Sequence, residues 1–261
     1  MLTDPAFLTA AIIAVILVGL AKGGFAGLGA LATPILALVI APTKAAAILL
    51  PILIVQDAVS LWNFRREWDR WIMGWMLPGA IGGVLIGYWF AAELSAEAVM
   101  AALGAITLGF GLYRLIIEYR ARRRQEQLVA STSPGWVGML FGMATGFTSQ
   151  IAHLGGPPFQ MWVTPRRLPH LVYIGTQVLL FAILNWIKVP TFIALGEFDR
   201  EVLTISAALI PLAIASTMAG VWLVRRISAA RFYTLIYVLM VLLGGKLLWD
   251  AAGAFGGATG A

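Results

Sequence analysis

Charged residues are scarce in this 261-residue sequence, and cysteine is absent from it. Asp, Glu, Lys and Arg together make up 11% of the chain, whereas ordinary soluble domains carry about a quarter. Hydrophobic residues make up 61%, more than the interior of a soluble protein of this length can hold. The lack of cysteine excludes disulfide bonds and thiolate metal sites. The composition therefore indicates an integral membrane protein and excludes a soluble enzyme.

The N-terminal segment lacks the basic residues that begin a signal peptide. It reads MLTDPAFLTAAIIAVILVGL, with Asp4 where Lys or Arg is usual, so we expect the segment to be retained. Apolar segments of about 20 residues, the length needed to cross a bilayer, then recur along the chain. Residues 98–117, 205–224 and 232–249 are examples. We therefore expect a multi-pass protein of a prokaryotic inner membrane.

Basic residues gather in four clusters, and these clusters predict the orientation of the chain in the membrane. Thirteen of the eighteen lysines and arginines lie in them: Arg65, Arg66 and Arg70; Arg114, Arg120, Arg122, Arg123 and Arg124; Arg166 and Arg167; Arg225, Arg226 and Arg231. Loops rich in Lys and Arg face the cytoplasm. The other connections carry mostly acidic residues, so we expect them and both termini to face outward. This placement explains the net charge of +6, and no nucleic-acid partner is expected.

The charge pattern defines six spans and two segments that begin and end on the same side. The spans are expected at 44–62, 71–91, 96–117, 170–195, 201–224 and 228–249. The two other segments, 6–41 and 135–164, are interrupted by glycines, and their second arms are too short to cross a bilayer comfortably. We interpret each as a re-entrant helical hairpin. Residues 118–134 are expected to form a basic cytoplasmic linker, and residues 251–261 a flexible tail.

The two halves of the chain resemble each other in sequence. LPGAIGGVLIGYW at 77–89 aligns with IPLAIASTMAGVW at 210–222, with Pro, Ala, Ile, Gly and Trp at matching positions. The charge rule sends the first segment outward and the second inward. The sequence thus predicts an all-α polytopic membrane protein built as an inverted repeat, 1–117 and 135–250, each half a re-entrant glycine-rich hairpin plus three transmembrane helices. Such repeats support alternating access around a central site.

Candidate binding residues gather at the two glycine-rich hairpin tips. Broken helices in transporters expose N–H groups that bind anions, and glycine lets a ligand approach the backbone. Close helix packing is the alternative explanation for the glycines. The candidate substrate-binding residues are Lys22, Gly23, Gly24, Gly27, Gly29, Ser149, Gln150, His153, Gly155, Gly156 and Gln177. We expect both tips to form one site for a small anion near the bilayer centre, with no metal or cofactor.

Ionisable residues inside the apolar segments are further candidates. Lys22 is costly in lipid unless it is paired, so either a bound anion is its partner or it reaches the cytoplasmic surface. Asp57 is the one acid well inside a predicted span, which makes it the candidate carrier of a coupling proton or cation. A structural pairing of Asp57 is the alternative. Asn185 could reach the tips or bridge helices, and Lys188 and Lys246 are interpreted as interfacial anchors.

These features resemble the TauE/SafE family of sulfite and organosulfonate exporters, which is grouped with toluenesulfonate uptake permeases. The resemblance rests on GGFAGLGALATP at 23–34, the long basic central loop, and Gly155-Gly156-Pro157, Pro165-Arg166 and Gly175-Thr176. The sequence departs from the family's pattern at Lys22, His153 and Gln177. The resemblance implies a secondary transporter of the exporter type for small sulfur-containing anions such as sulfite or organosulfonates.

The sequence leaves other functions open. The anion could be a carboxylate or thiosulfate, and transport could be uptake rather than export. An intramembrane protease built on Ser149 and His153 would lack a separate element to orient the pair. A retinal protein with Lys246 as the Schiff-base lysine would leave the internal repeat unexplained. Whether the protein forms a homo-oligomer is not decided by the sequence.

Overall fold

The computed structural model describes residues 1, 4–25, 28–37, 39–40, 42–90, 96–124, 129–152, 154–194 and 199–258. Within these ranges the chain is almost entirely helical and contains no strand. Seven helices in the described part are long and apolar enough to cross a membrane. The prediction of an all-α polytopic membrane protein is therefore confirmed.

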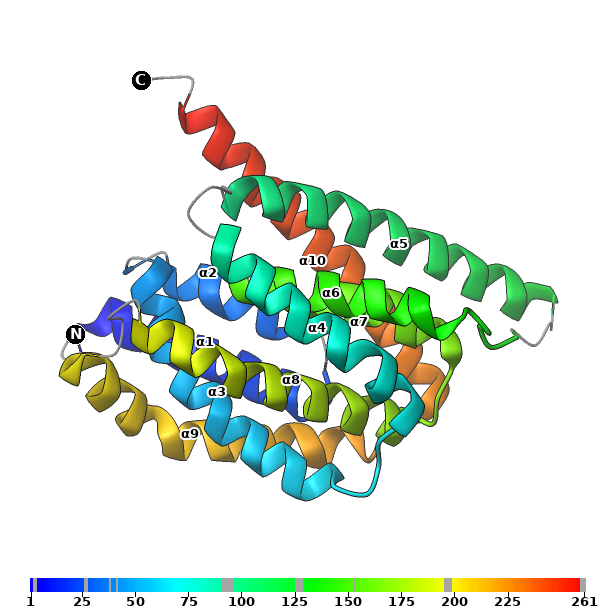
Figure 1. Ribbon diagram of the computed structural model, residues 1–261, viewed down its shortest axis with the longest axis horizontal. Coiled ribbons are helices and arrows are strands. Elements are labelled where there is room, and N and C mark those ends of the chain that lie inside the picture. The colour runs from blue at the N-terminus through cyan, green and yellow to red at the C-terminus, as the bar shows by residue number, and fades with distance from the viewer. Residues whose placement is uncertain are drawn as a thin grey trace. The chain divides into compact units, whose positions relative to one another are not determined.

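The helices follow the same order in both halves of the chain (Figure 1). The first half contains α1 (Pro5–Lys22), the 3-10 helix η1 (Leu28–Leu31), α2 (Ala32–Ala37), α3 (Pro42–Phe64), α4 (Arg70–Phe90) and α5 (Ala96–Arg124). The second half contains α6 (Gly135–Ala152), α7 (Gly156–Val163), the 3-10 helix η2 (Thr164–Arg166), α8 (His170–Ala194), α9 (Arg200–Val224) and α10 (Ala229–Ala258). Each half thus has a long helix, a short broken segment and three long helices. The inversion of one half relative to the other stays a prediction.

Three helices are longer than the sequence suggested. α5 continues to Arg124, so the predicted linker begins as helix, and α10 continues to Ala258 through most of the predicted flexible tail. The extension of α5 carries Arg and Glu, which are good helix formers. α1 has 18 residues and is itself a candidate span, although we expected it to end at half depth.

The chain folds into two compact units that cut across the two predicted repeats. Unit 1 comprises Met1–Met73 and Leu171–Ile227, and unit 2 comprises Gly74–His170 and Ser228–Ala261. Unit 1 combines α1, α2 and α3 with most of α8 and all of α9. Unit 2 combines most of α4 and all of α5 with α6, α7 and α10. Each unit therefore draws on both halves of the sequence.

In unit 1, α3 and α9 pack side by side and run in the same direction (Figure 1). Where they begin, Lys44 Nζ donates to Glu201 Oε2 over 2.6 Å. Where they end, Arg225 Nη2 donates to the carbonyl oxygen of Asn63 over 2.9 Å. Polar contacts at both ends thus hold the two apolar helices in register.

α8 runs opposite to α3 within unit 1. Near its start, Thr176 Oγ1 accepts a hydrogen bond of 2.9 Å from the N–H of Asp69, which follows α3. Near its end, Phe192 joins the apolar core that contains Ala45 and Ile48 from the first half of α3. The relative directions of α3, α8 and α9 agree with those that the basic clusters indicate. Which end faces the cytoplasm stays a prediction.

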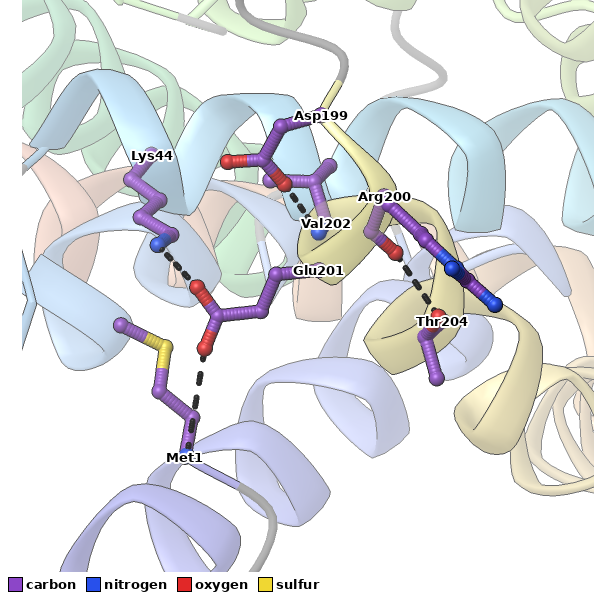
Figure 2. Close-up of polar contacts among 7 residues, drawn as sticks. All are labelled: Met1, Lys44, Asp199, Arg200, Glu201, Val202 and Thr204. Atoms are coloured by element: carbon purple, nitrogen blue, oxygen red, sulfur yellow. Dashed lines mark hydrogen bonds and ion pairs between the residues drawn. The ribbon is translucent and has the colours of Figure 1, made fainter.

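The first predicted hairpin begins and ends at the same end of unit 1. The terminal amine of Met1 lies 4.0 Å from Glu201 Oε1, and Lys44 binds the other oxygen of the same carboxylate (Figure 2). Beside them, Asp199 caps α9 by accepting a hydrogen bond of 2.7 Å from Val202 N. The residues before α1 and after α2 therefore meet at one carboxylate.

The second predicted hairpin closes in a similar way in unit 2. The N–H of Ser131 donates to the carbonyl oxygen of Pro165 over 2.9 Å. Arg166 Nη2 donates to the carbonyl oxygen of Ser133 over 2.5 Å and to its hydroxyl over 3.0 Å. The chain thus enters α6 and leaves η2 at the same place. The re-entrant placement of both hairpins in a bilayer stays a prediction.

Glycines bring α4 and α6 into backbone contact in unit 2. A Cβ atom on Gly83 would lie 2.0 Å from the carbonyl oxygen of Met143, and one on Gly146 would lie 1.9 Å from that of Ala80. Both helices carry glycine at every fourth position along this face. Lipid supplies no hydrophobic drive between helices, so close packing of small residues holds them together.

Gly83→Ala should destabilise the protein, because the added methyl group meets backbone rather than a flexible side chain. We expect a loss of roughly 1–3 kcal/mol in the free energy of unfolding, the usual cost of overpacking. Gly82→Ala is the matched control, since a Cβ on Gly82 meets nothing within 4 Å. Thermal unfolding in detergent measures both. Equal unfolding temperatures for the two variants would contradict the close α4–α6 contact.

Candidate functional site

α1 ends in a turn that glycine forms readily. Gly24 has a φ angle of +132°, a conformation that other residues rarely adopt. The N–H of Gly24 binds the carbonyl oxygen of Ala21 and the N–H of Phe25 binds that of Leu20, each over 3.1 Å. This pair of bonds defines a Schellman motif. Helix termination therefore explains Gly24, which we had assigned to substrate binding.

Close packing against neighbouring helices sets where α1 ends in unit 1. A Cβ on Gly23 would lie 2.4 Å from Cα of Gly220 in α9, and Ser60 Oγ in α3 donates to the carbonyl oxygen of Lys22 over 3.0 Å. Gly220 and Ser60 each lie four residues before the end of their helix. α1 thus ends about one turn from the ends of α3 and α9. The depth of Lys22 in the bilayer stays a prediction.

Lys22 turns back from that end to form an ion pair inside unit 1. Its Nζ lies 2.5 Å from Asp57 Oδ1, and Asn185 Nδ2 donates to Asp57 Oδ2 over 2.6 Å. The side chain of Lys22 is 13% exposed, and Asp57 and Asn185 are 1% and 3% exposed. α1, α3 and α8 each contribute one residue. In unit 1 the carboxylate of Asp57 is therefore a partner of the Lys22 ammonium group.

Lys188 is a second buried cation in the same unit. It follows Asn185 by three residues, which places both on one face of α8, and it is 1% exposed. It interacts electrostatically with Lys22 and with Asp57. Six residues of α8 follow it, so its interpretation as an interfacial anchor is wrong. The three-residue spacing from Asn185 inside an apolar segment was the available signal, and we missed it.

Lys22, Asp57, Asn185 and Lys188 form what we call the charged cluster. The cluster brings two lysines, one carboxylate and one amide together in the interior of unit 1. Phe181 lies one turn before Asn185, with its ring centre 5.6 Å from Lys22 Nζ. A buried ammonium is costly unless an anion lies beside it. The cluster thus has the charge and the donors to hold a small anion.

The other predicted residues of the first tip contribute less. Gly29 lies in η1, where a Cβ would be 3.1 Å from Cβ of Ala21, and Gly27 lies outside the described residues. The second arm is the four-residue η1 followed by the six-residue α2. Segments this short align few peptide dipoles. The structure therefore favours side chains over a helix end as the anion ligands in unit 1.

The predicted residues of the second tip lie in unit 2 at the end of α6. Ser149 and Gln150 are buried there, 3% and 8% exposed. Thr148 closes the following turn, because its hydroxyl donates to the carbonyl oxygen of Leu154 and its own carbonyl oxygen accepts from Leu154 N, each over 3.1 Å. His153 lies outside the described residues.

α7 begins with fewer amide donors than we expected. Gly155 precedes it and Gly156 begins it, with nothing within 4 Å of a Cβ placed on Gly156. Pro157 and Pro158 follow and have no N–H groups. Gln160, one turn later, is fully buried, and its amide makes no hydrogen bond within the described chain. Gln160 is thus a polar candidate that the sequence analysis missed.

Gln177 does not join the charged cluster. It lies on α8 eight residues before Asn185, about two turns away, and is half-buried. Unit 1 thus unites Lys22 and Asp57 with Asn185 and Lys188, while Ser149, Gln150 and Gly156 belong to unit 2. The single site formed by both tips stays a prediction.

The described residues contain no acidic or histidine group suited to a metal ion.

The family model described as "Sulfite exporter TauE/SafE" matches residues 11–247. The chain belongs to the TauE/SafE family. The match takes in both halves of this TauE/SafE protein and every residue of the charged cluster. Searches of curated proteins and of solved structures give no match. The family assignment and the seven apolar helices together make the protein a multi-pass membrane protein of a sulfite-exporter family.

Breaking the Lys22–Asp57 pair should destabilise the TauE/SafE protein. Lys22→Met or Asp57→Asn alone removes one side of a buried ion pair, which costs roughly 3–5 kcal/mol in protein interiors. The double variant removes both charges and should recover much of that loss. A double-mutant cycle of thermal unfolding measures the coupling.

The exposed pair Lys246 and Asp250 on α10 provides the control for this cycle. Their side chains are 44% and 25% exposed, and they lie four residues apart on one helix. Such a pair contributes about 0.5 kcal/mol or less. Similar coupling energies for the two pairs would show that Lys22 and Asp57 are not buried together.

Proposed function

We propose that this TauE/SafE protein is a secondary transporter that exports small sulfur oxyanions, with sulfite as the leading candidate. The observation that carries the proposal is the charged cluster, which brings two lysines, Asp57 and Asn185 together inside unit 1. Asp57 already accepts from Lys22 and Asn185. The cluster thus gathers cationic donors in one buried place, and the family supplies the chemical class of the anion.

The donor set suits an oxyanion rather than a halide or a bulky ligand. Two lysine ammonium groups offer several N–H donors, and the Asn185 amide offers another. Hydrogen bonds from charged donors to anionic oxygen are short and strong. Phe181 and the surrounding apolar helices exclude water, which strengthens these bonds. A small anion with several oxygens can use all of these donors at once.

Asp57 gives this site a means of coupling transport to protons. An anion that binds Lys22 competes with Asp57 for the same ammonium group. A displaced carboxylate is costly inside a membrane protein unless it takes up a proton, and acidic residues in spans commonly act as proton carriers. We propose that anion and proton occupy the site together, and that alternating access exposes it to each side in turn.

The cluster chemistry alone also fits other small oxyanions. Carboxylates and thiosulfate carry the same charge-bearing oxygen groups, and the ion pair does not set the direction of transport. The family match favours sulfite and export among these. A binding assay in which these anions compete for the site ranks their affinities.

Lys188→Met should weaken sulfite binding by about tenfold or more, because one charge-assisted hydrogen bond contributes roughly 1.5–3 kcal/mol. Lys246→Met is the matched control, since it removes an exposed lysine from another helix. Binding is measured as the rise in unfolding temperature with sulfite concentration, because a true ligand stabilises the folded state by mass action. Unchanged sulfite affinity in Lys188→Met would remove the charged cluster from the binding site.

Asp57→Asn should uncouple sulfite flux from a pH gradient in proteoliposomes, because asparagine cannot carry a proton. Asp57→Glu keeps a titratable group and should retain coupling. The double variant Lys22→Met/Asp57→Asn serves if the single variant does not fold. Gradient-driven flux equal to wild type in the asparagine variants would leave Asp57 with a structural role alone.

A further inference from the structure

A pocket opens at the end of α3 in unit 1. It has a volume of about 240 Å³ and is lined by Trp62, Asn63, Arg65, Arg66 and Glu67. These residues form the last turn of α3 and the start of the connection to α4. The lining is polar and basic, so the pocket suits an anionic group.

The pocket's Trp62 and Trp222 near the end of α9 are both exposed, and each is stacked with an arginine. Arg65 lies over the ring of Trp62 at 4.4 Å, and Arg226 lies over that of Trp222 at 3.9 Å. Trp62 is 73% exposed and Trp222 is 56% exposed. A guanidinium group stacked on an aromatic face still presents its N–H edge to a ligand. Both arginines are therefore oriented without losing their donors.

Acidic residues near the pocket are already engaged. Glu67 Oε2 lies 3.6 Å from Arg225, and Asp69 Oδ1 accepts from Ile72 N at the start of α4 over 2.9 Å. Arg65 and Arg66 form no ion pair with a carboxylate in the part of the chain that the structure describes. Their positive charge is thus available to an external anion.

We propose that this pocket binds the headgroup of an anionic phospholipid. Trp62 and Trp222 each lie two residues before the end of a long apolar helix, the position at which tryptophan marks the membrane interface. Basic clusters of this kind attract the anionic lipids of the cytoplasmic leaflet. Arg65 and Arg66 bind the phosphate through paired N–H groups. The lipid acyl chains then lie along the apolar ends of α3 and α9.

Lipid titration followed by native mass spectrometry tests this site. Purified, delipidated protein is titrated with phosphatidylglycerol or with phosphatidylcholine. We expect one phosphatidylglycerol molecule to bind preferentially, and Arg65→Gln/Arg66→Gln to weaken it by about 30-fold, since each basic residue contributes about 1 kcal/mol near anionic lipid. Arg120→Gln/Arg123→Gln removes the same charge from exposed positions on α5 and should change binding by less than about threefold.

Three results would overturn the proposal. Equal losses in the two double variants would indicate nonspecific attraction, and equal binding of the two lipids would exclude recognition of an anionic headgroup. Displacement of the lipid by millimolar inorganic phosphate would assign the pocket to a free anion. The unfolding temperature of each variant without lipid separates loss of binding from loss of fold. Sulfite binding at the charged cluster is a separate measurement, so this proposal and the transport proposal fail independently.

Discussion

A charge inside an apolar membrane protein must find its partner within the protein, and the Lys22–Asp57 ion pair meets that requirement in unit 1. The pair requires α1 to end beside α3, and close contact between Gly23 and Gly220 allows α1 to lie against α9. The Schellman turn at Gly24 then reverses the chain without a further helical turn. Glycine packing and helix termination thus set the position of Lys22, and its ion pair with Asp57 lowers the free-energy cost of burying its charge.

Lys188 adds a second buried cation to the same cluster. Lys188 is buried on the face of α8 that already presents Asn185 to Asp57. Ionisable residues buried inside membrane proteins commonly mark binding or transport sites. An anion that enters the cluster competes with the Asp57 carboxylate for the two lysine ammonium groups, or binds on the side opposite that carboxylate. Binding and proton coupling would then share the same few atoms.

Small residues govern the packing in both units. α1 meets α9 through Gly19 and Gly23, and α4 meets α6 through glycines at every fourth position. These contacts need no hydrophobic effect, which lipid would not supply between apolar helices. They also explain why the glycine-rich segments suggest a ligand site when the sequence is read alone. Glycine allows a ligand and a neighbouring helix equally to approach the backbone closely.

The sequence by itself determined the membrane class, six of the seven candidate spans and the family, because long apolar segments, basic loops and short motifs are local properties. It also singled out Lys22 and Asp57, since ionisable residues are rare in apolar segments. Only the tertiary structure decided that these two residues pair, that Asn185 joins them and that Lys188 is buried beside them. Those contacts join helices far apart in the chain, and a helix has no sequence signal for the neighbour its polar face will meet. The place where α1 ends was likewise set by its contact with α9, a helix far away in the chain.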